Sequence, residues 1–234
     1  MTFGVWATQG SPSVTEMAVH LGLDWVCVSL EHGYLEVRDV LAHVRAARRS
    51  DTAVVVRVPA FTQDWIKRVL DVGADGVIAP LVRSAEDVAL AARYAPAGVR
   101  GIGGDVSSKW GVRDMDYLRS ANEEIMVIPL VETAEATANF ADIVAVPGIE
   151  AVYFGPADLS ASLGYVGDWE GPGVAERILE MKDTAAAAGV ASGVMVTGAE
   201  DGRRRVEQGF RMIGLGTDTQ LLFRQLTDIY STVR

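Results

Sequence analysis

Residues 53–82 read AVVVRVPAFTQDWIKRVLDVGADGVIAPLV, and this stretch contains the repeat from which the chain is built. It opens with a β-branched run at 53–58, continues with a helical pattern that closes on Gly73, and ends with a second apolar run at 76–82. Runs that are apolar almost throughout are typical of parallel strands covered on both faces. The stretch therefore predicts a strand–helix–strand unit of an α/β fold.

Similar apolar runs recur along the chain with helical patterns between them. They lie at residues 3–8, 25–30, 125–132, 151–156, 192–196 and 211–216. Together with the first stretch they make eight strand–helix units without a linker, which predicts a single-domain (β/α)8 TIM barrel over residues 1–234. An open doubly wound sheet is the alternative. The connection at 97–124 is unusually long and holds Lys109 and Arg113, and long loops in compact domains are usually functional.

The composition excludes several classes of protein. A net charge of −10 argues against a nucleic-acid surface, which needs clustered Lys and Arg. Cys27 is the only cysteine, so no internal disulfide can form, which favours a reducing compartment. No signal-peptide pattern and no apolar run long enough to span a membrane are visible in the sequence. We therefore expect a soluble cytoplasmic protein that binds neither nucleic acid nor membrane.

Polar residues follow the predicted strands at the end where a barrel carries its active site. Glu31 and His32 follow the second strand, Arg57 lies in the third, and Glu132 and Asp158 end the fifth and sixth. The two acidic residues fit either a divalent cation or caps of the helices that follow. An arginine in an apolar strand needs an anionic partner, either a structural carboxylate or a substrate. The histidine fits acid–base work or an ordinary surface position.

Several stretches together resemble one family. They are GVWAT, LDWVCVSLEHG, IKRVLDVGADGVIAPLV, RGIGG, VETAEA, GLGTDTQLL and, most specifically, YFGPADLSASLGY. They resemble the HpcH/HpaI aldolase/citrate lyase family, and within it the class II pyruvate aldolases that act on hydroxy-ketoacids. The resemblance covers nearly the whole chain. It implies a TIM barrel whose C-terminal helix is swapped between subunits, in a homo-oligomer that is a hexamer built as a trimer of dimers.

The resemblance also implies roles for individual residues. Glu132 and Asp158 would bind Mg²⁺, Mn²⁺ or Co²⁺. Arg57 would stabilise the enolate of pyruvate. His32 would perform acid–base catalysis and would be oriented by Asp71.

The same resemblance implies a substrate pocket. Trp6 and Leu221 would line it, and the backbone around Gly155, Ala157 and Asp158 would hold the carboxylate of pyruvate. The chain departs from the family pattern at two positions: Ser29 replaces an aspartate, and Leu130 replaces a glutamine.

The expected reaction is the metal-dependent cleavage of a 4-hydroxy-2-ketoacid to pyruvate and an aldehyde. The apolar runs contain no lysine for a Schiff base, which favours a metal mechanism. Two alternatives remain open at this point. They are a lyase of CoA esters of the citramalyl or malyl type, and a repurposed barrel that binds a ketoacid.

Overall fold

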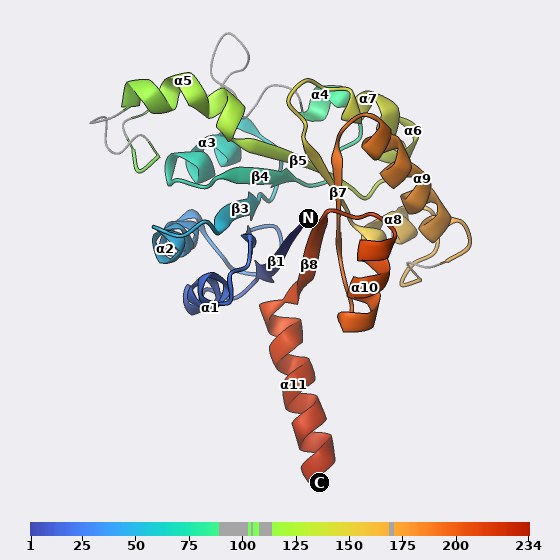
Figure 1. The fold of residues 1–234 in the computed structure, drawn as a ribbon. Helices are drawn as coiled ribbons and strands as arrows, with labels where there is room; N and C mark the ends of the chain where they lie inside the picture. Colours follow the sequence, from blue (N-terminus) through green and yellow to red (C-terminus); the bar gives the residue numbers. More distant parts are fainter. Residues whose placement is uncertain (89–102, 104, 108–113, 169–170) are drawn as a thin grey trace.

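Eight parallel strands close into a barrel in the computed structural model, which describes residues 1–88, 103, 105–107, 114–168 and 171–234 (Figure 1). The strands are β1 (Thr2–Ala7), β2 (Trp25–Ser29), β3 (Ala53–Arg57), β4 (Gly76–Ala79), β5 (Met126–Val131), β6 (Ala151–Phe154), β7 (Ala191–Met195) and β8 (Met212–Thr217). Each strand pairs with the next strand in the sequence, and β8 pairs with β1 to close the ring. The closed ring confirms the predicted (β/α)8 barrel and excludes the open sheet.

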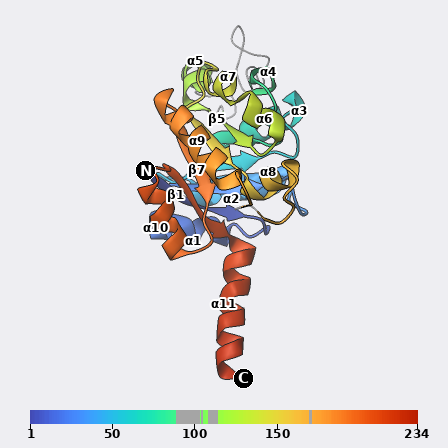
Figure 2. The same cartoon turned by 90° about the vertical axis from the view of Figure 1, so that its right-hand side faces the viewer.

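The chain also forms helices, all of which except the last surround this ring on its outer side (Figures 1 and 2). They are α1 (Ser13–Leu21), α2 (Val37–Ala47), α3 (Gln63–Asp71), α4 (Ala85–Val88), α5 (Asp114–Glu124), α6 (Ala134–Ala138), α7 (Phe140–Val144), α8 (Pro156–Ser162), α9 (Val174–Ala187), α10 (Ala199–Glu207) and α11 (Asp218–Val233). In the described part of the chain, no helix is both long and apolar enough to cross a membrane.

Two details differ from the sequence prediction. The connection at 97–124 is not all loop, because its last part forms α5, which has few apolar residues in its sequence DMDYLRSANEE. The strand predicted at 76–82 ends at Ala79, because Pro80 has no N–H for the ladder and the chain turns at Leu81. Lys109 and Arg113 lie outside the described residues.

The barrel interior is filled by large side chains from alternating strand positions. Trp6, Trp25 and Tyr153 pack together there, with ring centroids 5.5 Å apart for Trp6–Tyr153 and 6.3 Å apart for Trp25–Tyr153. Leu130 and Cys27 belong to the same cluster. Burial raises the pKa of the Cys27 thiol to about 12, which agrees with its prediction as a core residue rather than a nucleophile.

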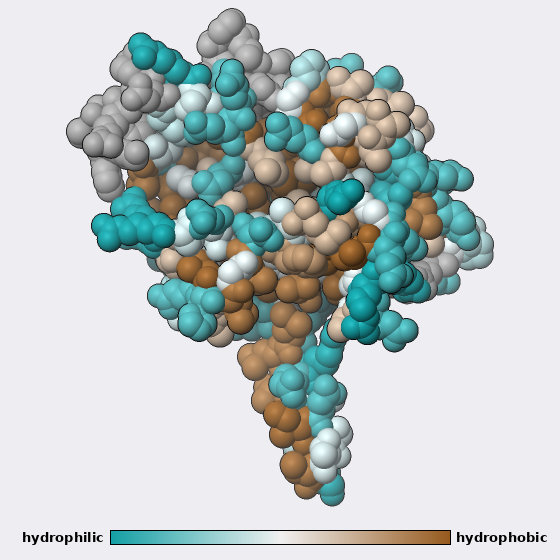
Figure 3. All heavy atoms as spheres, viewed as in Figure 1, coloured by the Kyte–Doolittle hydropathy of each residue, from teal (hydrophilic) through white to brown (hydrophobic). Residues whose placement is uncertain are grey.

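The last helix, α11, extends away from the barrel instead of covering it (Figures 1 and 2). All of its sixteen residues are described and none of them is buried. Apart from Leu221 near its start, its exposed apolar side chains are Leu222, Phe223, Leu226, Ile229, Tyr230 and Val233. They form a long apolar stripe on the projecting helix (Figure 3).

Two polar contacts fix the direction in which α11 leaves the barrel. The Asp218 carboxylate accepts hydrogen bonds from the backbone N–H groups of Thr8 and Gln9, both at 3.0 Å. Six residues further along the helix, Arg224 Nη1 donates to the carbonyl of Thr197 at 2.7 Å. These hydrogen bonds join the start of α11 to the segments that follow β1 and β7. They hold the first two turns of the helix against the barrel, although the rest of it projects.

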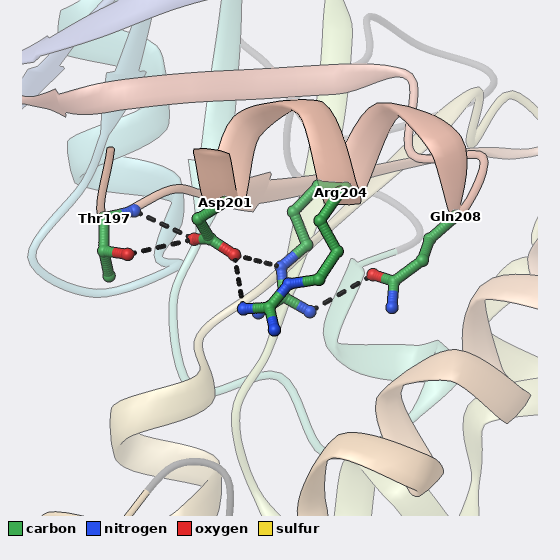
Figure 4. Close-up of polar contacts among 5 residues, drawn as sticks. Thr197, Asp201, Arg204 and Gln208 are labelled. Atoms are coloured by element: carbon green, nitrogen blue, oxygen red, sulfur yellow. Dashed lines mark hydrogen bonds and ion pairs between the residues drawn. The ribbon is translucent and has the colours of Figure 1, made fainter. Parts of the chain in front are cut away.

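Thr197 is itself held by α10. Asp201 accepts from the Thr197 N–H at 2.9 Å and from its hydroxyl at 3.2 Å, and it also pairs with Arg204 and Arg205, each at 3.0 Å (Figure 4). These neighbouring cations and hydrogen bonds outweigh burial and lower the pKa of the Asp201 carboxyl. The loop after β7 is therefore a rigid support for α11.

Candidate active site

Arg57 ends β3 at the mouth of the barrel, where its guanidinium is held on three sides. Nε and Nη2 donate to the Ser29 hydroxyl oxygen at 3.0 and 2.8 Å, and Nη1 lies 2.8 Å from Glu31 Oε2. The guanidinium carbon lies 4.8 Å from the centroid of the Trp6 ring, a cation–π contact. The register explains the first contact, since Ser29 and Arg57 are partners in the β2–β3 ladder. Of the two kinds of anionic partner that the sequence left open for Arg57, the structure contains a carboxylate of the same chain, that of Glu31.

Glu31 and His32 follow β2 but differ in exposure. The Glu31 side chain is 13% exposed and pairs with Arg57, whereas the His32 side chain is 72% exposed. His32 Nε2 lies 3.8 Å from Glu31 Oε2, which is too long for a hydrogen bond. The imidazole is therefore close to the Arg57–Glu31 pair and open to the solution at the barrel mouth.

Glu132 follows β5 and is only 3% exposed. Burial raises its pKa to about 7, and the negative charges of Glu31 and Asp158 add to the effect, while the Leu81 N–H and the charge of Arg57 oppose it. The Leu81 N–H donates to Oε1 at 2.7 Å. A bound cation or a proton stabilises a buried carboxylate that has two acidic neighbours.

Asp158 reaches the same mouth from the first turn of α8. Gly155 precedes this helix and lies against Glu132, because a Cβ on Gly155 would be 2.8 Å from Glu132 Oε2. Asp158 and Ala157 are exposed. Among the described residues, no three His, Cys, Asp or Glu side chains gather as a metal-binding group. The two carboxylates nevertheless fit an ion such as Mg²⁺, which takes one or two carboxylates and completes its shell with water and substrate.

Residues 2–224 match the model of the HpcH/HpaI aldolase/citrate lyase family. The chain belongs to this family. It is 36% identical to a 4-hydroxy-2-oxovalerate aldolase from Rhodococcus jostii, over 95% of this chain and 87% of that protein. It is also 36% identical to a hydroxypyruvate/pyruvate aldolase from Delftia acidovorans, over 94% and 83% of the two chains.

Solved structures of the HpcH/HpaI family share the whole fold. A crystal structure of a family protein from Burkholderia cenocepacia has a TM-score of 0.93 and 35% identity, and the match covers 100% of this chain and 94% of that one. The likeness therefore includes the barrel and the C-terminal part of the chain.

Two residues assigned through the HpcH/HpaI resemblance lie away from the mouth within this chain. Asp71 ends α3, and helices of this barrel run back towards the starts of the strands, so Asp71 is at the opposite end from His32. Leu221 lies on the outer flank, where it lines cavities beside Phe3 and Leu215. Trp6, Arg57, Glu132 and Gly155 do meet at the mouth or directly beneath it, and Asp158 is near enough for its charge to act on Glu132. Ala157 instead lines a cavity with Met195 and Phe223.

The sequence did not reveal two contacts of this HpcH/HpaI site. In the sequence, Ser29 stands out only as a departure from the family pattern. In the structure, its hydroxyl oxygen accepts two hydrogen bonds from Arg57. The Leu81 N–H donates a hydrogen bond to Glu132. The sequence gives no sign of this contact except Pro80, which marks the end of the preceding strand.

Proposed function

We propose that this protein is a class II, metal-dependent aldolase that reversibly cleaves a 4-hydroxy-2-ketoacid to pyruvate and an aldehyde. The observation that carries the proposal is the juxtaposition of the fixed Arg57 cation with the buried Glu132 carboxylate at the barrel mouth. The aldolase names of relatives that match nearly the whole chain support it. Those names do not favour the CoA-ester alternative.

Glu132 and Asp158 would hold the divalent ion, which is Mg²⁺, Mn²⁺ or Co²⁺. When bound, such an ion acts as a Lewis acid that stabilises negative charge on the former keto oxygen. The buried and oriented position of Glu132 suits a ligand, since little reorganisation is needed on binding. Backbone groups around Gly155 and Ala157 would hold the carboxylate of pyruvate.

Arg57 would stabilise the enolate. Its contacts with Ser29 and Glu31 fix the guanidinium before substrate binds, and fixed charge aimed at a developing oxyanion is the most effective kind of electrostatic catalysis. Trp6 packs on the guanidinium face and would form the wall beneath the substrate.

His32 would take the proton from the 4-hydroxyl group, because an imidazole changes charge near neutral pH and this one is open to the mouth. As that proton leaves, the bond between carbons 3 and 4 breaks, its electron pair passes into the enolate of pyruvate, and the aldehyde is released. Protonation of the enolate at carbon 3 then gives pyruvate. Asp71 can orient His32 only if it belongs to a neighbouring subunit, because the two residues lie at opposite ends of one barrel. Leu221 likewise would line a pocket only of a neighbouring subunit.

The test is the release of pyruvate from a panel of 4-hydroxy-2-ketoacids, followed with lactate dehydrogenase, in Mg²⁺, Mn²⁺ or Co²⁺ and in EDTA. We expect metal-dependent release that EDTA abolishes and that Glu132→Ala eliminates without unfolding the protein. A folded, metal-binding protein that releases no pyruvate with any ion would contradict the proposal and support the barrel that only binds ketoacids. Activity on CoA thioesters alone would support the other alternative.

We further propose that α11 is swapped between subunits of a hexamer built as a trimer of dimers. The flank of the barrel between α1 and α10 carries two cavities of about 540 and 350 Å³, lined partly by Phe3, Val5 and Leu215. This is the flank that a helix after β8 would cover in a complete barrel. The exposed apolar stripe of α11 matches such a flank in character.

The oligomer proposal is tested by light scattering after size-exclusion chromatography. Phe223→Glu places a charge on the stripe and should shift the protein to smaller species. Ser231→Glu adds the same charge on the opposite face of the same helix and should leave the hexamer intact. A wild-type protein that elutes as a monomer at all concentrations would contradict the swap.

A further inference from the structure

Leu81 has a backbone conformation that its side chain disfavours. It lies just after β4, with φ at +52°. Left-handed backbone is uncommon for residues other than glycine, asparagine and aspartate, because the Cβ crowds the following carbonyl. Its side chain is 53% exposed, so burial of the side chain does not account for the conformation. Strained backbone of this kind persists where the surrounding structure imposes it, and such positions cluster at functional sites.

The turn places one backbone group against the candidate active site. The Leu81 N–H points to Glu132 Oε1 and donates to it at 2.7 Å. The next residue is fastened to the same strand end, since the Thr133 hydroxyl donates to the Val82 carbonyl at 3.1 Å. The loop after β4 is therefore bound to the end of β5 at two consecutive residues, Glu132 and Thr133.

The second carboxylate oxygen of Glu132 is confined by Gly155. Gly155 leaves just enough room for Oε2, as an added Cβ would come within 2.8 Å of it. A carboxylate held by an amide at one oxygen and by close backbone at the other has a restricted orientation.

We infer that the left-handed turn at Leu81 is a positioning device for Glu132, in which the strained backbone aims its amide so that the carboxylate is preset for a divalent ion. The inference rests on the proposed function, because it takes Glu132 as a metal ligand. Hydrogen bonds to ligating carboxylates orient them, and losing such a partner typically weakens metal binding about 10- to 100-fold. Leu81 acts through its backbone and does not itself touch the ion.

The test exploits which side chains tolerate positive φ. Glycine and asparagine accept it, so Leu81→Gly and Leu81→Asn should bind Mn²⁺ within about twofold of wild type. A β-branched residue resists it, so Leu81→Val should turn the amide away and weaken binding about tenfold or more. The readout is calorimetric titration of metal-free protein with Mn²⁺ in the absence of substrate, together with the melting temperature of the metal-free protein.

The chain offers a matched control. Arg49 is also a non-glycine residue with positive φ, at 73°, but it lies beyond the end of α2 at the opposite end of the barrel. Arg49→Val should impose a similar backbone penalty and lower the melting temperature without changing Mn²⁺ affinity. If Leu81→Val does not fold, Leu81→Thr, which is also β-branched but suits an exposed position, should show the same loss.

The outcomes separate this inference from the function on which it rests. Wild-type affinity in Leu81→Val, while Glu132→Gln has lost Mn²⁺ binding, would overturn the positioning role alone. Wild-type affinity in Glu132→Gln would overturn the metal assignment, and the positioning role with it. Weakened binding in Leu81→Gly equal to that in Leu81→Val would also overturn the inference, because the effect would then follow the lost side chain rather than the backbone.

Discussion

Arg57 donates two hydrogen bonds to a single oxygen, the hydroxyl of Ser29, at 3.0 Å from Nε and 2.8 Å from Nη2. Ser29 is completely buried. It orients the guanidinium without adding negative charge, so the cation keeps its attraction for a developing enolate.

We therefore expect Ser29→Ala to lower kcat for ketoacid cleavage about 30-fold. The change leaves two charged donors without their acceptor, which costs about 2 kcal/mol of transition-state stabilisation. Ser192→Ala is the matched control, because Ser192 is also a buried strand serine but its hydroxyl has no partner among the described residues. Equal kcat in Ser29→Ala and wild type would show that Ser29 does not position Arg57.

His32→Asn should lower kcat by about 100-fold or more, since positioned acid–base groups typically contribute that much. Binding of pyruvate should remain close to wild type, because the proposed ligands of pyruvate do not include His32. The measurements are steady-state kinetics and pyruvate titration. His20→Asn changes an exposed helical histidine and should have no effect. A full-rate His32→Asn enzyme would assign the proton transfer to another group.

Metal affinity should rise with pH through about 7. Burial raises the pKa of Glu132 from 4.5 to about 7, so below that pH a proton competes with the ion for the carboxylate. Between pH 6 and pH 7 we expect the apparent affinity for Mg²⁺ to increase up to about tenfold, with release of one proton. Calorimetry in buffers of different ionisation enthalpy measures both quantities. Affinity that does not change over this range would contradict a protonated Glu132 in the metal-free protein.

The same shift predicts how the stability of the metal-free protein depends on pH. The folded state holds the Glu132 proton more tightly than the unfolded state, so this contribution is complete below pH 4.5 and is lost as pH rises through about 7. A shift of that size corresponds to about 3 kcal/mol. Melts in EDTA should show the loss in wild type, and Glu132→Gln should lack it.

Gly155→Ala should weaken metal binding strongly. The new Cβ would lie 2.8 Å from Glu132 Oε2 and 3.0 Å from Glu132 Cβ, so the glutamate must move. Gly202→Ala is the control, because its Cβ would meet Val196 at an ordinary 3.7 Å and alanine favours the helix. Mn²⁺ titration of both variants checks the prediction, and unchanged affinity in Gly155→Ala would contradict the close packing.

Much of the fold could be predicted because parallel barrel strands are buried on both faces and therefore appear as apolar runs. The convergence of Arg57, Glu132 and Asp158 followed from the barrel, since its strand ends meet at one mouth. The contact of Ser29 with Arg57 could not be predicted, because it depends on the register of β2 against β3, which one sequence does not reveal.

Other features depend on properties that sequence patterns do not carry. The positive φ of Leu81 contradicts local preference, so it becomes visible only in the structure. The role implied for Asp71 could have been questioned from topology alone, because a residue that ends a barrel helix lies far from the strand ends that form the mouth. An amphipathic pattern predicts α11 as a helix but does not reveal which surface it covers.

The projecting α11 has a thermodynamic consequence. Isolated helices of about this length are marginal in water, and α11 gains no buried residue from its own chain. If α11 packs on a second chain, as proposed above, the order of residues 218–233 depends on the encounter of two chains, and forming this helix is then a bimolecular event. Dilution should lower the helical content of the C-terminus together with the melting temperature, and concentration would act on this protein as a ligand does on others.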